Sequence, residues 1–463
     1  MVARGNSLAS RDIASLVHPY TNLKLHESEG PVVITRGKGI YVYDETGKEY
    51  IEGLASLWCA SLGFDEQRLA AAAYAQLKKL PTYHIFASKS HDTGIELAEK
   101  LLAMSPTPMS KVFFASSGSE ANDTAMKLVW YYNNALGRPK KKKIVSRMKA
   151  YHGVTIAAAS LTGLPANQRD FDLPIAGVVH AECPHHYGYA EPGENEEQYA
   201  SRLAENFEKL ILREDPATVA AFIAEPIMGA GGVIVPPATY FDKIQPILRK
   251  YDILFIVDEV ICGFYRTGNL WGSQTFDLKP DMVTMAKAMS AAYLPISALM
   301  ISEPIWQAMV SESQKIGVFG HGYTYSAHPA AAAVAMETLK IYEEREILTH
   351  VRRMAPRLQQ GLRRFANHPL VGEVQGMGLL GALQLVKTKQ PKRFFEATQP
   401  VAPFMAKRAQ EHGLIVRALF ENRIAMCPPL IIDEAQIEEV LRRFALALDD
   451  TWAMVQEKGL AAA

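Results

Sequence analysis

One lysine stands alone in an apolar stretch of the sequence. The segment "MVTMAKAMSAAYLP" (282–295) contains a single charged residue, Lys287. Burying an ammonium group is unfavourable unless the group is paired or gives up its proton. Lys287 therefore either extends its amine to solvent from the end of a helix, or keeps it neutral because the amine is a nucleophile.

A second segment, "SSGSEAN" (116–122), has the composition of a phosphate site. Gly118 lets a ligand approach the backbone closely, and Ser119 offers a hydroxyl group. The helical pattern that follows presents free N–H groups and the positive end of a helix dipole. An ordinary capped turn is the alternative, because it favours the same residues. The segment is neither a Walker A loop nor a GxGxxG fingerprint, which argues against nucleoside triphosphates and dinucleotides.

In "FIVDEV" (255–260), the carboxylate of Asp258 follows an apolar run. Asp258 stands at the carboxyl end of this predicted strand, and ligands of open α/β sheets bind at such ends. Val260 follows two residues later and shares the same face if the strand continues. A carboxylate and an apolar surface would together suit a flat aromatic cation.

The segment 116–122, Asp258 and Lys287 offer a phosphate site, a carboxylate and a nucleophilic amine. Pyridoxal phosphate requires these three groups. Its phosphate must be anchored, its ring nitrogen kept protonated by an acid, and its aldehyde held by a lysine. Tyr151 in "KAYHGVT" (149–155) follows a predicted strand and is a candidate to stack on the ring, with a core aromatic as the alternative. Thr324 in "YTYSAHP" (323–329) is a further candidate to donate a hydrogen bond to the phosphate, with a residue of a surface turn as the alternative.

These side chains need a scaffold of alternating strands and helices. The runs "TVAAFIAEP" (218–226) and "DILFIVDEV" (252–260) are apolar on both faces, and an amphipathic pattern over 240–251 lies between them. This alternation predicts an α/β domain with a mainly parallel sheet and helices on both faces. Period-two alternation predicts an antiparallel hairpin over 36–53, and 376–385 reads as one strand. We therefore predict a large cofactor-binding domain over 66–330 and a smaller α+β domain built from 1–65 and 331–463.

Composition excludes several classes of protein. The 463 residues carry a formal net charge of zero, which argues against a nucleic-acid or polybasic membrane surface. No apolar run approaches the roughly 20 residues that span a bilayer, and the first residues do not resemble a signal peptide. The four cysteines form no CxxC pair, and "CPHHYG" (183–188) lacks a second pair of ligands at zinc-like spacing. We therefore expect a cytoplasmic protein with no metal site and no disulfide framework.

The order of several motifs resembles the class III aminotransferases, on the fold type I scaffold of pyridoxal-phosphate enzymes. The motifs are "SGSEAN", "YHG", "AEPIMGAGG", "DEVICGF-RTG", "AKAMS" and "YTYSAHP", and the likeness extends from "GKGIYVYDETGKEYIEG" to "CPPLIID". Within that class, "LASLWCASLG" and "LIVRALFENRIAMCPPL" are most similar to amine:pyruvate and ω-amino-acid:pyruvate transaminases.

The resemblance implies a role for each cofactor position. Lys287 would be the Schiff-base lysine and Asp258 would pair with the ring nitrogen. Tyr151 and Val260 would pack on the two ring faces, and Glu225 would lie near the cofactor oxygen. The remaining positions implied to bind the cofactor are Ser117, Gly118, Ser119, His152 and Thr324.

The resemblance also implies a substrate pocket and a partner subunit. Thr324 would reach the phosphate of a neighbouring subunit, which implies a homodimer, or a tetramer, with shared sites. Arg417 corresponds to a mobile arginine that binds the carboxylate of a keto acid. The positions implied to contact substrate are Tyr20, Leu57, Trp58, Phe86, Tyr151, Ala230, Ile261 and Arg417.

The implied activity is transfer of an amino group from an amine or ω-amino acid to pyruvate. The sequence leaves the donor open among β-alanine, taurine, a polyamine and an aryl amine. Another class III activity, such as an aminomutase or a dialkyl amino acid decarboxylase, is the nearest alternative. A nicotinamide oxidoreductase and an inactive binding protein are more distant ones. Tyr265 and Ala292 stand where the family commonly has glycine, which makes the local loop conformation an open question.

Overall fold

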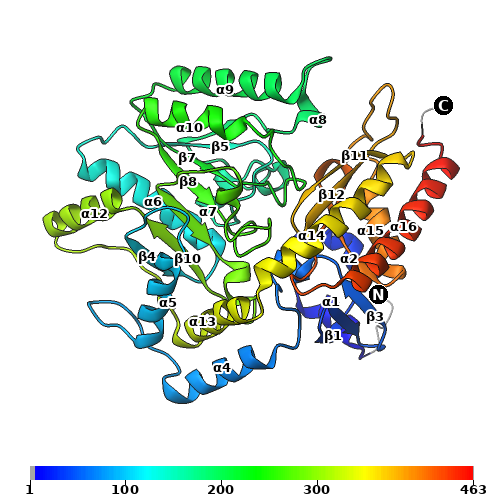
Figure 1. The fold of residues 1–463 in the computed structure, drawn as a ribbon, viewed down its shortest axis with the longest axis horizontal. Helices are drawn as coiled ribbons and strands as arrows, with labels where there is room; N and C mark the ends of the chain where they lie inside the picture. Colours follow the sequence, from blue (N-terminus) through cyan, green and yellow to red (C-terminus); the bar gives the residue numbers. More distant parts are fainter. Residues whose placement is uncertain (1–5, 462–463) are drawn as a thin grey trace.

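A seven-stranded sheet forms the centre of the structure, a computed structural model that describes residues 6–461 (Figure 1). The strands lie in the order β4-β10-β9-β8-β7-β5-β6. Only β10 runs antiparallel to its neighbours, β4 and β9. The strands are β4 (Lys111–Ala115), β5 (Lys143–Arg147), β6 (Val178–Ala181), β7 (Val219–Ala224), β8 (Leu254–Asp258), β9 (Met282–Met285) and β10 (Ser297–Ile301).

Helices cover both faces of this sheet, because its strands are apolar on both sides. One face packs α9 and α10 against β5, β7 and β8, and packs α5 and α13 against β4, β9 and β10. The opposite face is covered by α6, α7 and α12. These helices are α5 (Asp92–Ala103), α6 (Gly118–Ala135), α7 (Ile156–Leu161), α9 (Glu196–Arg213), α10 (Tyr240–Lys250), α12 (Glu303–Ile316) and α13 (Pro329–Glu344).

Two smaller sheets bring the two ends of the chain together at the right of Figure 1. The first has the order β1-β2-β3-β13, and β13 pairs in parallel with β3 through Leu414 and Ile51. The second has the order β11-β12-β15-β14. Their strands are β1 (Ile34–Lys38), β2 (Tyr41–Asp44), β3 (Glu49–Glu52), β11 (Val371–Met377), β12 (Leu380–Leu385), β13 (Leu414–Ile415), β14 (Arg417–Leu419) and β15 (Arg423–Met426).

Several other helices pack on these two sheets or on the helices of the central sheet. The helix α4 packs against α13, and α15 packs against α16. The remaining elements are α1 (Leu8–Ser15), α2 (Leu23–Glu29), α3 (Ala55–Trp58), α4 (Gln67–Lys79), α8 (His186–Tyr189), α11 (Gly272–Thr275), α14 (Ile347–Arg363), α15 (Val401–Glu411), α16 (Glu434–Glu457), η1 (Pro165–Asn167), η2 (Lys287–Ser290), η3 (Arg364–Asn367) and η4 (Phe420–Asn422).

The α/β fold with a mainly parallel sheet is confirmed, and two local predictions need comment. The antiparallel pair β2–β3 lies within the predicted hairpin over 36–53, and β1 adds a further antiparallel strand. The single strand predicted over 376–385 is wrong, because a turn at Gly378, with φ of +60°, divides it between β11 and β12. The domain boundaries at residues 65 and 330 stay predictions. No helix in residues 6–461 is long and apolar enough to cross a bilayer.

Candidate active site

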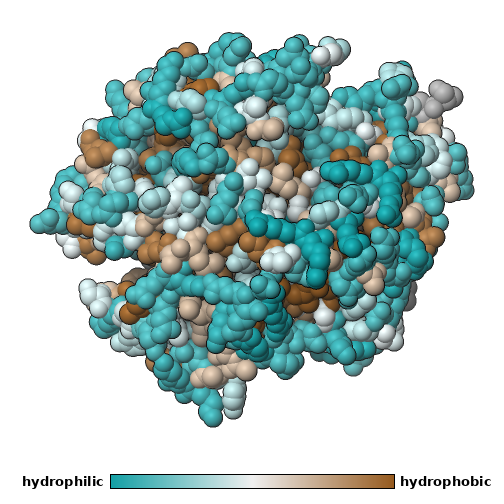
Figure 2. All heavy atoms as spheres, in the orientation of Figure 1, coloured by the Kyte–Doolittle hydropathy of each residue, from teal (hydrophilic) through white to brown (hydrophobic). Residues whose placement is uncertain are grey.

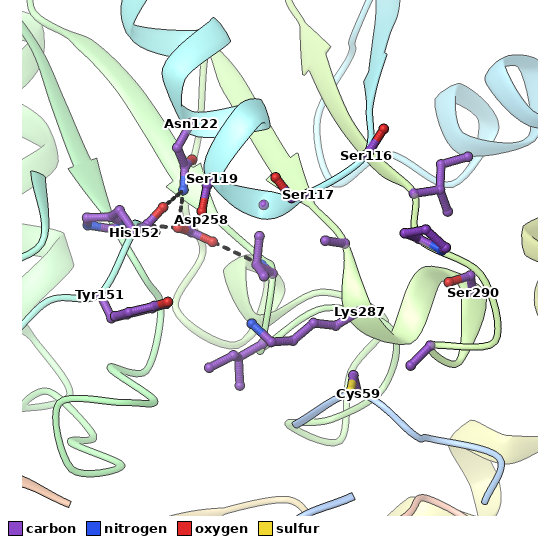
Figure 3. Close-up of a pocket in the computed structure, with 18 of the residues that line it drawn as sticks. Cys59, Ser116, Ser117, Ser119, Asn122, Tyr151, His152, Asp258, Lys287 and Ser290 are labelled. Carbon is purple, nitrogen blue, oxygen red and sulfur yellow. Dashed lines mark hydrogen bonds and ion pairs between the residues drawn. The ribbon is translucent and has the colours of Figure 1, made fainter. Parts of the chain in front are cut away.

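The parallel strands place their carboxyl ends along one edge of the central sheet, and the predicted residues follow those ends. A cavity of about 370 Å³ opens there, a size typical of small-molecule sites. Figure 3 shows Asp258, the serines of the turn after β4, Tyr151 and Lys287 around the same space. The cavity is lined by Cys59, Ser116, Ser117, Gly118, Ser119, Asn122, Tyr151, His152, Gly153, Glu225, Asp258, Val260, Ile261, Ala286, Lys287, Ser290, Ala292, Leu294, Pro295 and Ile296.

Asp258 is the last residue of β8 and is held by three hydrogen-bond donors. Its Oδ2 atom lies 2.8 Å from Asn122 Nδ2 and 2.8 Å from His152 Nδ1. Its Oδ1 atom accepts a hydrogen bond of 3.0 Å from the Val260 backbone N–H. These contacts fix the orientation of the carboxylate at the cavity wall.

The condition for Val260 to share a strand face with Asp258, which is that the strand continues past Asp258, is not met. The strand β8 ends at Asp258, and Val260 belongs to the turn that the Asp258 side chain closes. Val260 nevertheless lines the cavity. A Cβ atom on Gly118 would lie only 3.2 Å from the Val260 methyl groups, so the phosphate turn packs directly on this residue.

Lys287 follows β9 and opens the short helix η2. Its backbone φ of +49° lies in the left-handed region that non-glycine residues rarely adopt. Its side chain faces the cavity and has no ion-pair partner in residues 6–461. Desolvation lowers the pKa of the Lys287 amine, and the nearby Asp258 charge opposes that effect. The amine is thus biased toward the neutral, nucleophilic form.

The turn after β4 combines a helix cap with free backbone donors. The Ser117 side chain accepts a hydrogen bond from the Glu120 N–H, and Glu120 in turn accepts from the Ser117 N–H, which completes a capping box. Gly118 and Ser119 occupy the first two helical positions, whose N–H groups have no partner within a helix. These two groups open the positive end of α6 to the cavity, so the predicted cap and the predicted phosphate site coexist.

Two further residues form the wall after β5 and β7. Glu225 accepts hydrogen bonds from the backbone N–H groups of Tyr151, at 3.0 Å, and Gly229, at 2.9 Å. Burial raises the pKa of Glu225, and desolvation likewise raises that of Tyr151. Gly153, with φ of +134°, lies where any Cβ would meet Ser119 Oγ at 2.4 Å. Only glycine therefore lets the Tyr151 turn pack against the phosphate turn.

The polar groups of this cavity fit pyridoxal phosphate. His152 Nε2 and Asn122 Oδ1 are buried and have no hydrogen-bond partner in the described part of the chain. The first turn of α6 and the Asp258 carboxylate line the cavity, and the Lys287 side chain enters it from the side opposite Ser117 and Ser119 (Figure 3). These are the phosphate, ring-nitrogen and aldehyde partners that the cofactor requires.

Of the predicted substrate residues, only Tyr151 and Ile261 line this cavity. Tyr20 and Arg417 gather beside Tyr151, with the Arg417 guanidinium 5.9 Å from the centre of the Tyr20 ring. The Tyr20 hydroxyl accepts a hydrogen bond of 2.5 Å from Asn167.

The other predicted substrate residues lie at the borders of the cavity. Trp58 is buried in an apolar cluster with Ile261, and its neighbour Leu57 is exposed. Ala230 lies in the turn between Met228 and Ile234, whose Gly229 contacts Ile261.

Phe86 and Thr324 do not belong to the lining of the cavity. Phe86 packs on Gly322, because a Cβ added there would lie 2.9 Å from the Phe86 ring. Thr324 follows two residues later and is exposed. Neither residue contacts the cavity of its own chain.

Tyr265 and Ala292, which stand where the family commonly has glycine, adopt the left-handed backbone conformation that favours glycine. Tyr265 has a φ of +75° and Ala292 a φ of +65°. A left-handed conformation at such residues costs roughly 1–2 kcal/mol. The Tyr265 ring is buried edge-to-face against Tyr342, at 5.6 Å between ring centres, and this packing offsets part of that cost.

Sequence reasoning missed several residues of the cavity wall. Asn122 stands inside the quoted motif "SGSEAN", four residues along α6 from Gly118, so helical periodicity could have placed it on the same face. Cys59, Ser290 and the segment 294–296 carried no comparable signal. They reach the cavity through the folding of loops.

Comparison with known proteins identifies relatives over most of the chain. Residues 24–448 match the family described as aminotransferase class-III. The chain is 50% identical over 428 residues to "Gamma aminobutyrate transaminase 3, chloroplastic" of Solanum lycopersicum, covering 92% of this chain and 82% of that protein. It is equally 50% identical over 428 residues to "Vanillin aminotransferase" of Capsicum chinense, covering 92% of this chain and 93% of the relative.

A solved structure matches the fold over nearly its full length. The crystal structure of the omega transaminase from Pseudomonas jessenii in complex with PMP has a TM-score of 0.96 and 55% identity, covering 97% of this chain and 99% of that one. The motifs of the sequence, the residues of the cavity and the relatives all indicate the same family. The chain belongs to the class III aminotransferases, fold type I enzymes that use pyridoxal phosphate to transfer amino groups.

Proposed function

We propose that this enzyme transfers the amino group of a primary amine or ω-amino acid to pyruvate or a similar keto acid, giving an aldehyde or ketone and alanine. The choice of acceptor rests on one observation, which is the burial of the Arg417 guanidinium without a carboxylate partner in the described residues. Its guanidinium is half-buried, and desolvation lowers its pKa. It has no carboxylate partner in residues 6–461.

A half-buried guanidinium without a partner favours the binding of an anion. Arg417 lies beside Tyr20 and Tyr151, and Tyr151 lines the cavity. A keto acid presents a planar carboxylate, which a guanidinium binds with two parallel hydrogen bonds. Keto acids are therefore the acceptors that suit this site best.

The remainder of the pocket supports an apolar or extended donor. Ile261 and Val260 line the cavity, and Trp58 packs behind Ile261. The relatives are named for gamma-aminobutyrate, an ω-amino acid, and for vanillin, an aromatic aldehyde. Both names are consistent with an amine donor whose amino carbon bears no carboxylate.

The chemistry requires an electrophile that the side chains lack. Pyridoxal phosphate supplies an aldehyde that bonds to amines and a ring that accepts electrons. We propose that Gly118, Ser119 and the partner's Thr324 hold its phosphate and that Tyr151 and Val260 pack on its ring. Asp258 would keep the ring nitrogen protonated, with His152 and Asn122 orienting that carboxylate.

Lys287 would act on protons as well as on the cofactor. In its neutral form, the Nζ atom would take up a proton from the donor carbon that bears the amino group and would later return it. Burial favours this role because it lowers the pKa of the amine. In the second half-reaction, Arg417 would bind the carboxylate of the keto acid.

Replacing Arg417 with alanine should separate the two half-reactions. Pyruvate amination is expected to lose about 10- to 1000-fold in kcat/KM, because a charged hydrogen-bond pair is lost. Deamination of 1-phenylethylamine, which has no carboxylate, should change little. Single-turnover absorbance of the cofactor measures each half-reaction alone.

The matched control is Arg36→Ala. Arg36 also lies over a tyrosine ring, at 3.5 Å from the centre of Tyr43, but outside the cavity. This control should leave both half-reactions unchanged. Equal losses in both halves for Arg417→Ala would remove Arg417 from the site. Product formation from the amine without any keto acid, or release of carbon dioxide, would instead indicate an aminomutase or a decarboxylase.

We further propose a homodimer whose sites are shared between subunits. Phe86 packs on Gly322, two residues before Thr324, and neither Phe86 nor Thr324 lines its own cavity, which supports a role for both in a neighbour's cavity. Large apolar side chains near the site are exposed, as expected of a surface that a partner covers. They are Leu57, Phe86, Val154, Ile156, Val318 and Tyr325. Figure 2 shows one largely hydrophilic face with apolar residues gathered near its middle.

Dilution tests the shared sites. If Thr324 completes a neighbour's phosphate site, separating the subunits should release the cofactor and abolish activity together. Analytical ultracentrifugation with absorbance of the bound cofactor follows both quantities down to nanomolar protein. A monomer that keeps its cofactor and its activity at that concentration would refute shared sites.

The cytoplasmic location also remains a proposal. The relative from Solanum lycopersicum is chloroplastic by its name. Cell fractionation of the source organism, followed by an activity assay, would decide the compartment.

A further inference from the structure

Three potential metal ligands converge near the N-terminus, away from the cofactor cavity. Asp12 belongs to α1, His26 belongs to α2, and His18 lies in the segment that joins the two helices. One carboxylate oxygen and one ring nitrogen from each histidine all lie within 4.8 Å of one another. From this geometry we propose that Asp12, His18 and His26 form a binding site for a divalent transition-metal ion, with Zn²⁺ as the best fit.

The distances are close to those that a metal requires. Both histidines present the same ring nitrogen to the same carboxylate oxygen. Asp12 Oδ1 lies 2.8 Å from His18 Nε2 and 3.2 Å from His26 Nε2. Zinc bonds of about 2.0–2.1 Å place the ligand atoms of a tetrahedral site about 3.3 Å apart. Small side-chain movements would therefore open this group to the separation that Zn²⁺ sets.

The donor set selects the class of ion. Two imidazoles and one carboxylate, with no sulfur, are the ligands of three-residue zinc sites whose fourth position holds water. Imidazole nitrogen disfavours Ca²⁺ and Mg²⁺, which prefer oxygen. Water can reach the fourth position, because the side chain of His18 is 29% exposed while that of His26 is only 9% exposed.

The charges around Asp12 favour a cation. No lysine or arginine in residues 6–461 pairs with Asp12, and its partners there are the two histidines. The pair His412–Asp450 differs, because Arg408 also binds Asp450, with Nε at 3.0 Å and Nη2 at 2.8 Å. A metal ion at Asp12 would supply the positive charge that an arginine supplies at Asp450.

The other sequence candidate for a metal does not assemble in this way. In "CPHHYG", His185 Nε2 pairs with Glu373 at 2.8 Å, and Arg423 binds the same carboxylate at 2.9 Å. His186 interacts with the backbone oxygen of Glu194 at 2.8 Å. Both histidines of the motif thus have other partners in the described residues. The sequence analysis did not find the cluster of Asp12, His18 and His26, because these residues are spaced by 6 and 8 positions and match no known short metal-binding motif.

Metal binding would fix the segment that carries Tyr20. Tyr20 lies between the ligands His18 and His26, has a φ of +52°, and hydrogen-bonds to Asn167. Arg417 lies over its ring. An ion held by α1, the joining segment and α2 would therefore stiffen one wall beside the substrate region. This consequence for substrates rests on the proposed function, whereas the binding of the ion does not.

The test measures binding directly on the holoenzyme, without an activity assay. After treatment with EDTA and its removal, isothermal titration with ZnCl₂ should reveal one saturable site per chain with micromolar or tighter affinity. His18→Gln and His26→Gln should each weaken that site by about 100-fold or more, because each removes a ligand. Circular dichroism and absorbance of the bound cofactor verify that each variant is folded.

The matched control is His412→Gln, which removes another carboxylate-paired histidine whose side chain is 27% exposed. It should bind Zn²⁺ as the wild type does. X-ray absorption of the zinc-loaded wild type should report nitrogen and oxygen ligands with two imidazoles. The proposal is overturned if no saturable site exists, if His26→Gln binds as tightly as the wild type, or if the spectrum contains a sulfur ligand.

Discussion

Replacing Lys287 with alanine is expected to reduce kcat/KM on the order of 10⁴-fold or more. The reason lies in two functions of one amine. We propose that its Nζ atom both holds the cofactor covalently and serves as the base for the carbon that bears the amino group. Burial lowers its pKa, which increases the share of the neutral form that both functions need.

The measurement combines turnover with covalent trapping. Borohydride reduction followed by mass spectrometry should attach the cofactor to Lys287 in the wild type and leave the Lys287→Ala chain unlabelled. Lys141→Met is the matched control, because Lys141 is also buried, with a pKa lowered by desolvation, but hydrogen-bonds to the Tyr251 backbone oxygen far from the cavity. Normal turnover in Lys287→Ala would refute the assignment of the whole site.

Replacing Asp258 with asparagine should leave the cofactor bound but reduce the rate of the amine half-reaction by about 10²- to 10⁴-fold. The phosphate turn at Gly118 and Ser119 is untouched, so binding persists. An amide cannot supply the negative charge that keeps the ring nitrogen protonated, and a neutral ring accepts electrons poorly. The donors Asn122 and His152 would also face an NH₂ group in one of the two orientations of the new side chain.

Stopped-flow absorbance with excess amine measures this half-reaction, and the cofactor content is determined separately. Asp123→Asn is the matched control. Asp123 is a partly buried carboxylate of the same helix as Asn122, and it accepts hydrogen bonds from Thr155 and the Ala158 N–H outside the cavity. If Asp258→Asn reacts with the amine as fast as the wild type, Asp258 does not serve the ring nitrogen. If Asp258→Asn loses the cofactor instead, its main role is structural.

Several features of the site follow from local sequence. The apolar run that ends at Asp258 predicts a buried strand, and parallel strands bring their carboxyl ends to one edge. Gly118 and Ser119 precede a helix whose first N–H groups must be free. Lys287 has no charged neighbour in its segment, which singled it out. Each of these signals spans a few residues, so the sequence alone carries it.

Other local features were left open or predicted wrongly, because continuation and termination of strands depend on neighbours. The strand β8 stops at Asp258 because its own side chain accepts the Val260 N–H and closes a turn. The stretch 376–385 divides at Gly378 because the left-handed turn there reverses the chain, so that β12 pairs antiparallel with β11. Apolar periodicity reports burial, and it does not report where a chain reverses.

The sequence by itself determined the chemical groups, their order along the chain and the type of sheet that carries them. Only the tertiary structure decided which groups meet. His152 and Asn122 converge on Asp258 from 106 and 136 residues away, Arg417 lies beside Tyr20 with no carboxylate partner among the described residues, and Asp12 shares its carboxylate with two histidines. These contacts depend on how whole helices and sheets pack, because the packing fixes distances between segments that no spacing in the sequence records.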